Sequence, residues 1–269
     1  IAWLGNAIDY DGLRLDAGKH TPWEFFGNDQ VGFLHEAQFN QSLRRGYDDY
    51  NNNSTVFQNN IKRDHSLIFA EILSPWNELT YWANNNPMRF LDNGIKKTAE
   101  SALSGSIGDF NGMGKDFGPE KGIMYTWGHD EGQGGKVDLG YAYTLTHIGF
   151  PMVYFTGKNI SWEDKATRTW MIPGYDDFAL GDNGGKTLNM VWINTHFAWG
   201  SEWNRWADPD FLALERFDDL NGNSLPDSGE GILLVALNDS GWDITHELQT
   251  AFADGTVLKD YTGNNGNNV

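Results

Sequence analysis

The chain has 269 residues and 39% of them are hydrophobic, which is enough for one large domain or for a domain with a smaller module. The formal net charge of −18 argues against nucleic acids and anionic membranes as partners, because like charges would repel them. No cysteine is present, which excludes disulfides, thiolate metal sites and cysteine nucleophiles, and no apolar run approaches the roughly 20 residues that span a bilayer.

Aromatic side chains make up 14% of the sequence, with 12 Trp and 10 Tyr. A sugar ring offers flat C–H faces that stack on indoles, and hydroxyls that bond to polar partners such as Asn and Asp. The abundance of Trp, Asn and Asp therefore favours a carbohydrate ligand. That any single Trp is instead a core or interface residue stays equally open.

Segments typical of strands and of helices alternate over residues 10–197. Strands are predicted at residues 10–16, 66–73, 88–95, 122–127 and 150–155, and helices at residues 25–45, 96–104, 138–147 and 186–197. An Asn-rich stretch at residues 48–60 predicts a loop. Alternating strands and helices predict βαβ units and a parallel sheet.

The pattern changes near residue 210. Residues 211–217, 231–237 and 245–253 look like consecutive strands with no helix between them. We therefore predict two domains: an α/β domain over residues 1–209 and a small antiparallel β-domain over residues 210–269.

Three acids, Asp16, Glu71 and Asp130, stand at the ends of strand-like segments. The carboxyl ends of parallel barrel strands converge on one mouth, so acids that are distant in sequence can meet there. Glu71 lies inside a nearly continuous apolar run, typical of a strand buried on both faces. Burial would raise the pKa of its carboxyl, as a general acid requires. Structural pairing of this Glu with a buried Arg is the alternative.

These segments resemble conserved regions of the α-amylase family, glycoside hydrolase family 13. Gly12-Leu-Arg-Leu-Asp16-Ala-Gly-Lys-His20 resembles the second region, Phe69-Ala-Glu71 the third and Tyr125-Thr-Trp-Gly-His129-Asp130 the fourth. Thr146-His-Ile-Gly-Phe-Pro-Met-Val-Tyr-Phe-Thr-Gly157 resembles the last helix-to-strand passage of the family. All four follow the family's order. The resemblance implies an α/β fold, a (β/α)8 TIM barrel followed by a small antiparallel β-domain.

The resemblance also implies roles for the acids. Asp16 would be the nucleophile that forms a covalent glycosyl-enzyme intermediate, and Glu71 the general acid and base. Asp130 would bind substrate hydroxyls, with His129 beside it. Arg14, on the same strand face as Asp16, would hold that carboxyl ionised through charge-assisted hydrogen bonds.

Further substrate contacts are implied around these acids. Lys19 and His20 would line a leaving-group subsite, and the His20 backbone carbonyl would be a calcium ligand. Gly128 stands where the fourth region normally has Asn, and Trp127 replaces an acidic or polar residue. A Trp at that position could stack on a sugar.

The barrel is incomplete in this sequence. In the family the second region lies on the fourth barrel strand, and only about five barrel strands can be found here before the β-domain. The chain also begins at Ile1 rather than Met. We therefore expect the C-terminal part of a larger enzyme, in which an N-terminal part supplies strands 1–3.

A second calcium site is predicted between two of the C-terminal strands. Oxygen-bearing side chains occupy positions 1, 3, 5, 9 and 12 of a twelve-residue loop, as in EF-hands: Asp219, Asn221, Asn223, Asp227 and Glu230. The usual Gly at position 6 is Ser224 here. A polar hairpin without metal is the alternative.

The sequence thus predicts an extracellular or periplasmic, bacterial-like retaining hydrolase of α-1,4-glucans that contains structural calcium. A transglycosylase of the same family shares the covalent intermediate and stays open as an alternative. A non-catalytic relative that binds glycan or serves in assembly is a third possibility, although its acids would not need to be intact.

Overall fold

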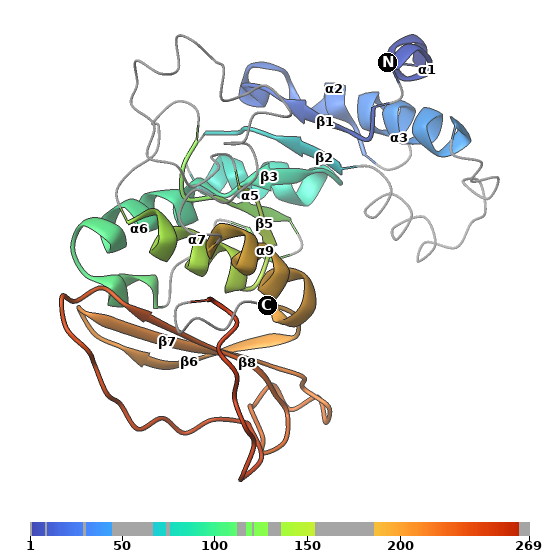
Figure 1. The fold of residues 1–269 in the computed structure, drawn as a ribbon. Helices are drawn as coiled ribbons and strands as arrows, with labels where there is room; N and C mark the ends of the chain where they lie inside the picture. The colour runs from blue at the N-terminus through green and yellow to red at the C-terminus, as the bar shows by residue number, and fades with distance from the viewer. Residues whose placement is uncertain are drawn as a thin grey trace. The chain divides into compact units, whose positions relative to one another are not determined.

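The structure is a computed structural model that describes residues 2–8, 10–28, 31–44, 67–73, 76–111, 117–119, 121–128, 136–153 and 186–263. No helix in these ranges is long and apolar enough to cross a membrane. The chain divides into two compact units (Figure 1), the first formed by residues 1–93 and 115–123 and the second by residues 94–114 and 124–269.

Five short strands form one sheet in chain order, β1-β2-β3-β4-β5. They are β1 Gly12–Leu15, β2 Leu67–Ala70, β3 Arg89–Leu91, β4 Gly122–Met124 and β5 Phe150–Pro151. The pairs β1–β2, β2–β3 and β3–β4 are parallel. The predicted parallel sheet of about five strands is therefore confirmed.

The helices of the first unit are α1 Ala2–Ile8, α2 Trp23–Phe26, α3 Phe33–Arg44 and α5 Trp76–Asn85, with a short 3-10 turn η1 at Gly18–His20. A single helix over residues 25–45 was expected, and that expectation is wrong. The chain breaks between α2 and α3 at Gly27 and Gly32, whose φ angles of 74° and 98° do not fit an α-helix.

The core of the first unit lies on one face of β2. Ile68, Ala70 and Ile72 are buried there together with α3 and α5 side chains such as Leu34 and Trp82. The alternate residues of the strand are less covered, so the expectation that β2 is buried on both faces is wrong. The alternate residues Leu67 and Phe69 lie on the second face, and the next residue of that face is Glu71, directly after the strand.

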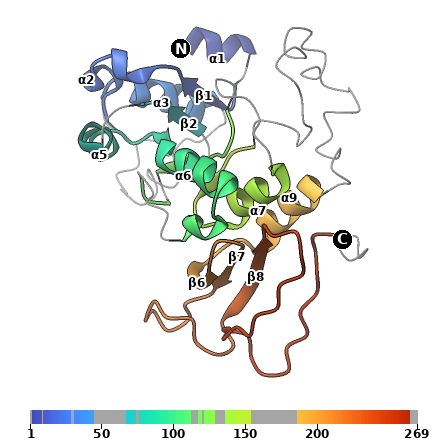
Figure 2. The same cartoon turned by 90° about the vertical axis from the view of Figure 1, so that its left-hand side faces the viewer.

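The second unit contains an antiparallel sheet, β6 Ser201–Ala207, β7 Phe211–Phe217 and β8 Gly231–Asn238, in the order β6-β7-β8. Its helices are α6 Asn93–Ser104, α7 Val137–Thr146 and α9 Lys186–Phe197, with the 3-10 turn η3 at Ile107–Phe110. Three of the predicted helices are thus confirmed. Figure 2 shows the sheet beneath α7 and α9.

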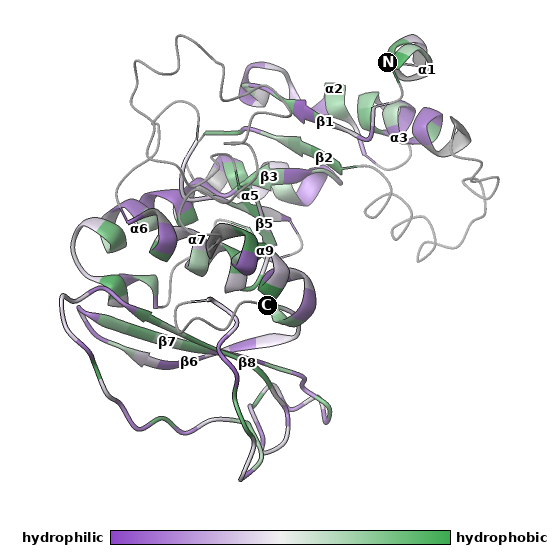
Figure 3. Ribbon diagram, in the orientation of Figure 1, coloured by the Kyte–Doolittle hydropathy of each residue, from purple (hydrophilic) through white to green (hydrophobic). Residues whose placement is uncertain are grey.

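One face of this sheet belongs to the core of the second unit. Leu212, Leu214, Val235 and Leu237 are buried in one cluster with α6 and α7 residues, and hydrophobic colour follows β7 and β8 in Figure 3. All seven residues of β7 are buried, which explains the strong apolar pattern that predicted this strand.

Two features of the second unit differ from expectation. Strand β6 was not predicted, and residues 245–253 form no strand. In that segment the backbone makes isolated contacts at Ala251, whose N–H donates to Glu215 and whose carbonyl accepts from Gly229 and Gly231. The two predicted domain ranges, 1–209 and 210–269, stay predictions, although the antiparallel sheet already begins at Ser201.

We predict that Gly12→Ala destabilises the protein. A Cβ at Gly12 would lie 2.1 Å from the backbone oxygen of Leu67, so β1 and β2 would have to separate. Such overpacking typically costs about 1–3 kcal/mol, which urea or thermal unfolding can measure. Gly118→Ala is the matched control, because a Cβ there has nothing within 4 Å. Equal stability of the two variants would contradict the prediction.

Candidate active site

The pairing of β1 with β2 brings two acids to the same level of the sheet. Leu15 lies opposite Ala70 in the parallel register, and each is the last residue of its strand. The residue that follows each strand is an acid, Asp16 after β1 and Glu71 after β2. The pairing continues one step further, because the Glu71 N–H donates to the Leu15 carbonyl at 3.0 Å. The carboxyl ends of these neighbouring strands therefore carry both acids.

Arg14 joins the two carboxylates. Its Nη1 donates to Asp16 Oδ1 at 2.8 Å, and its Nη2 donates to Glu71 Oε2 at 2.7 Å. A fork with fixed geometry thus bonds one acid two residues away and another 57 residues away. Arg14 and Asp16 thus lie on the same face of β1, as predicted. Glu71, which follows the neighbouring strand β2, lies on the same face of the sheet.

The two acids differ in their surroundings. The Asp16 side chain is 71% exposed, whereas that of Glu71 is 14% exposed and that of Arg14 is 35% exposed. Paired carboxylates in unequal environments are the usual arrangement for one acid that acts as nucleophile and another that carries a proton. One guanidinium bonds both of them, so the two carboxylates lie next to the same cation.

A tight turn directly after Asp16 completes this cluster. Ala17 is left-handed, with φ 46°, and the following Gly18 N–H donates to the Glu71 carbonyl at 3.0 Å. Gly18 is buried, and a Cβ there would lie 2.6 Å from Ile72 Cδ1. Sequence reasoning did not single out Gly18. Its only signal was a Gly two residues after a candidate nucleophile.

Lys19 and His20 lie on this turn and are exposed. The Lys19 ammonium donates to the Leu73 carbonyl at 2.9 Å, so its side chain runs along the end of β2. The structure thus brings Lys19 to the strand end that carries Glu71. Their roles toward substrate, and the His20 carbonyl as a calcium ligand, stay predictions.

The fourth motif is described only in part. His129 and Asp130 lie outside the described residues. Trp127 is 6% exposed and its ring packs edge-on against Tyr141, with ring centroids 5.1 Å apart. The side chain also fills the space over Gly140, where a Cβ would lie 2.2 Å from the ring. The prediction that Trp127 stacks on a sugar is therefore corrected: its ring is a core residue.

The loop at residues 219–230 is held by its own side chains. The Asn221 and Asn223 amides both donate to Asp227 Oδ2 at 2.8 Å. These two hydrogen bonds lower the pKa of the Asp227 carboxyl. Within the described ranges, no group of three or more His, Asp or Glu side chains is arranged to hold a metal.

Two details of the same loop nevertheless match a calcium-binding loop. Ser224, at the position where EF-hands place Gly, has φ 62°, and its N–H donates to Asp219 Oδ2 at 2.9 Å. The other oxygen, Asp219 Oδ1, is buried and accepts no hydrogen bond from any described residue. An unsatisfied buried carboxylate oxygen is a position that a cation would stabilise.

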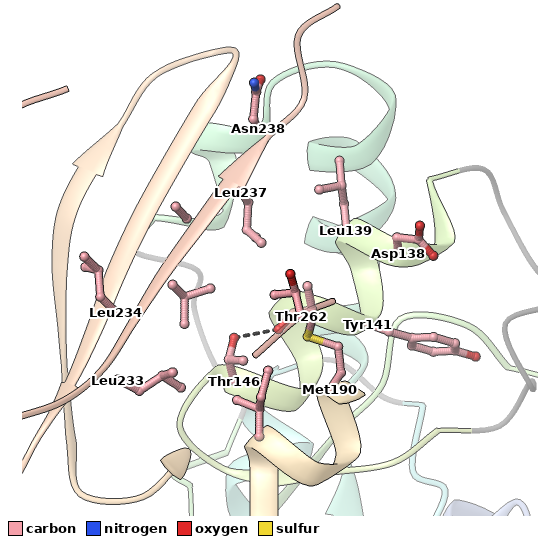
Figure 4. Close-up of a pocket in the computed structure, with 14 residues that line it drawn as sticks. Asp138, Leu139, Tyr141, Thr146, Met190, Leu233, Leu234, Leu237, Asn238 and Thr262 are labelled. Carbon is pink, nitrogen blue, oxygen red and sulfur yellow. Dashed lines mark hydrogen bonds between the residues drawn. The ribbon is translucent and has the colours of Figure 1, made fainter. Parts of the chain in front are cut away.

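The second unit contains a cavity of about 390 Å3 that sequence reasoning did not find (Figure 4). Its walls are mostly apolar side chains of α7, α9 and β8, with Asp138, Asn238 and Thr262 among the few polar ones. The hydroxyl of Thr146 is already used, since it donates to the Ala142 carbonyl at 2.5 Å. Among the described residues that line the cavity, Asp138 is the one acid, whereas the Arg14 cluster contains two.

No protein-family model and no curated protein matches this sequence. Among solved structures, the chain is similar to a cyclomaltodextrin glucanotransferase with a three-domain ABC distribution, at 17% identity and TM-score 0.55, covering 88% of this chain and 45% of that chain. It is also similar to an alpha-amylase from Anoxybacillus described as a new glycosyl hydrolase subclass, at 13% identity and TM-score 0.53, covering 81% and 48%.

A cyclomaltodextrinase is a third similar structure, at 13% identity and TM-score 0.53, with 88% of this chain and 38% of that chain covered. The chain spans less than half the length of each of the three. At such identities the likeness establishes the fold. The parallel sheet followed by an antiparallel β-domain therefore fits part of an α-amylase-type barrel with its C-terminal domain, as the motif resemblance implied.

Proposed function

We propose that this chain carries the nucleophile and the general acid/base of a retaining glycoside hydrolase that acts on α-1,4-glucans. The observation that carries the proposal is the Arg14 guanidinium bonded to both Asp16 and Glu71 at the ends of neighbouring parallel strands. Support also comes from the motif order and from the likeness in fold to solved amylase and cyclomaltodextrin enzymes.

The proposed reaction has two displacements. Asp16 attacks the anomeric carbon while Glu71 gives its proton to the leaving glycosidic oxygen, so a glycosyl ester of Asp16 forms and the aglycone leaves. Glu71, now ionised, takes a proton from water, which attacks the same carbon and releases Asp16. Net retention follows from two inversions.

Arg14 suits this sequence of charge changes. The negative charge belongs to Asp16 before the first step and to Glu71 after it, and one guanidinium bonded to both carboxylates can stabilise each in turn. In the same proposal, Lys19 and His20 line a leaving-group subsite, and His129 and Asp130 bind substrate hydroxyls.

Transfer to a sugar rather than to water is the second candidate. The likeness in fold to a cyclomaltodextrin glucanotransferase favours it, because that enzyme is named for such a transfer. Both reactions share the Asp16 ester, so products formed from maltooligosaccharides separate them: longer oligosaccharides indicate transfer and shorter ones hydrolysis. A chain that only binds glycan would yield neither product.

Azide rescue tests the two roles separately. Asp16→Ala and Glu71→Ala are each expected to lower kcat on maltooligosaccharides by at least about 10²–10⁴-fold. With an activated maltosyl substrate, azide should rescue Asp16→Ala as the inverted β-glycosyl azide, because a single displacement remains. Azide should rescue Glu71→Ala as the α-glycosyl azide, because it replaces water in the second displacement.

The control for this experiment is Glu24→Gln, an exposed acid of α2 in the same unit, which should keep normal activity. The assays use the longest natural form of the protein. Near-normal activity of either Ala variant, or rescue with the opposite anomeric outcomes, would overturn the assignment of roles.

The proposed enzyme includes an N-terminal part that supplies barrel strands 1–3. In the described sheet β1 and β5 are the edges, and no strand of the described residues joins them. Closing a parallel barrel removes such edges and covers its inner side. The extracellular or periplasmic location stays a prediction.

The chain by itself should therefore fold poorly. Size-exclusion chromatography and urea unfolding of residues 1–269 are expected to show self-association or a broad transition, whereas a longer natural form should unfold cooperatively. A monomeric, soluble and cooperatively unfolding chain would contradict the need for further strands.

Calcium at residues 219–230 belongs to the same proposal. The buried Asp219 Oδ1 and the left-handed Ser224 support it. The Asn221 and Asn223 amides now donate to Asp227, so they would have to turn their oxygens inward as calcium replaces those donors.

Removal of calcium by a chelator should lower Tm by roughly 5–10 °C, if calcium is well above its Kd, and calcium but not ionic strength should restore it. Asp219→Ala should abolish this calcium dependence. Asp254→Ala, an exposed acid outside the loop, should leave it intact. A Tm that does not respond to calcium would remove the metal from the proposal.

A further inference from the structure

The antiparallel sheet has a second face that is turned away from α7 and α9. Residues that pair across antiparallel strands point to the same face, and Trp203 lies opposite Glu215 while Trp206 lies opposite Ala213. The residues of the other face, such as Leu212 and Leu214, pack into the core with helix residues. The two Trp of β6 are therefore on the outer face.

A β-bulge at Arg205 puts both indoles on this face. The register shifts between Asn204 and Trp206, so the two Trp side chains stand on the same side although three positions separate them. Without the bulge, strand alternation would turn one of them into the core. Each Trp is 39% exposed.

Arg205, which lies between the two Trp in the sequence, forms an ion pair with Glu215 of β7. Arg205 Nε donates to Glu215 Oε2 at 2.6 Å, and the Glu215 side chain is fully buried while that of Arg205 is 11% exposed. Glu215 also accepts the Ala251 N–H at 2.9 Å. Two Trp side chains, each 39% exposed and separated by the Arg205 position, do not by themselves form a continuous apolar patch of the kind that a protein partner usually covers.

The Trp206 ring is fixed by contacts with Asp208 and His246. Its indole N–H donates to Asp208 Oδ2 at 2.6 Å, and His246 packs on the ring at a centroid distance of 4.0 Å. The hydrogen bond from Trp206 lowers the pKa of the Asp208 carboxyl, which therefore stays ionised as an acceptor near neutral pH. Because the indole N–H is bonded to Asp208 and His246 packs on the ring, a ligand would contact Trp206 through the part of its ring that is exposed.

We infer that Trp203 and Trp206 form a second α-glucan binding surface, on the C-terminal sheet and separate from the Arg14 cluster. Two Trp side chains on one face of one strand, each partly exposed, match successive sugar rings of a chain, whose C–H faces stack on aromatic rings. A net charge of −18 argues against polyanions but not against a neutral polysaccharide. The choice of an α-glucan rests on the proposed function.

The occupant can be tested by adsorption to granular starch and by calorimetric titration with β-cyclodextrin, a ring of α-1,4-linked glucose without chain ends. Glu71→Gln is used as background so that glucan is not consumed. Trp203→Ala and Trp206→Ala should each weaken binding about 10-fold, and the double variant by more. Trp206→Phe, which keeps an aromatic ring, should recover part of the loss.

The matched control is Trp199→Ala, a 49% exposed Trp in the loop before β6, which should bind as the parent does. With Glu71 restored, the double variant should hydrolyse short maltooligosaccharides normally, because these report only on the Arg14 cluster. If the unsubstituted protein does not hydrolyse maltooligosaccharides, that result counts against the proposed function. Starch adsorption that depends on Trp203 and Trp206 would still support the second surface.

Three results would overturn the inference: a parent that does not adsorb to starch, a double variant that adsorbs equally well, or a loss equally large in Trp199→Ala. A fourth is a double variant that changes from dimer to monomer in sedimentation experiments without a change in glucan binding. That result would make the face a contact between copies of the chain.

Discussion

The structure of the candidate site depends on one guanidinium. Arg14 bonds Asp16 and Glu71 together, and it can do so because β1 and β2 are paired in a register that ends both strands at the same level. That register in turn needs Gly12, where the backbone of β2 approaches too closely for a Cβ. A backbone contact thus sets the position of the two acids.

The two faces of β2 have different roles: one packs into the core and the other leads to Glu71. Ile68, Ala70 and Ile72 bury one face with α3 and α5, which anchors the strand, while Glu71 stands on the alternate face with 14% of its side chain exposed. The turn at Ala17 and Gly18 then brings the chain back to the Glu71 carbonyl. Core packing and site geometry therefore come from the same short strand.

In the second unit, buried charges are paired rather than absent. Arg216 lies on the core face of β7 and donates to the carbonyls of Thr146 and Gly200 at 2.9 and 2.7 Å. Burial lowers the pKa of this guanidinium, an effect that nearby Glu202 opposes. Glu215 on the opposite face is paired with Arg205. Strand β7 thus bonds to the end of α7 through Arg216 on one face, and on its other face Glu215 pairs with Arg205 of β6, the strand that carries Trp203 and Trp206.

The sequence by itself determined the alternation of strands and helices, the parallel sheet, and the positions of Asp16 and Glu71 directly after their strands, because hydrophobic periodicity and short motifs are local features. It could not determine that Arg14 reaches Glu71, 57 residues away, or that Trp127 is a core residue. Nor could it locate the break at Gly27 and Gly32 or the bulge that turns Trp203 and Trp206 to one face. Only the tertiary structure decided these points, because register, burial and close backbone approach arise from contacts between segments that are distant in sequence.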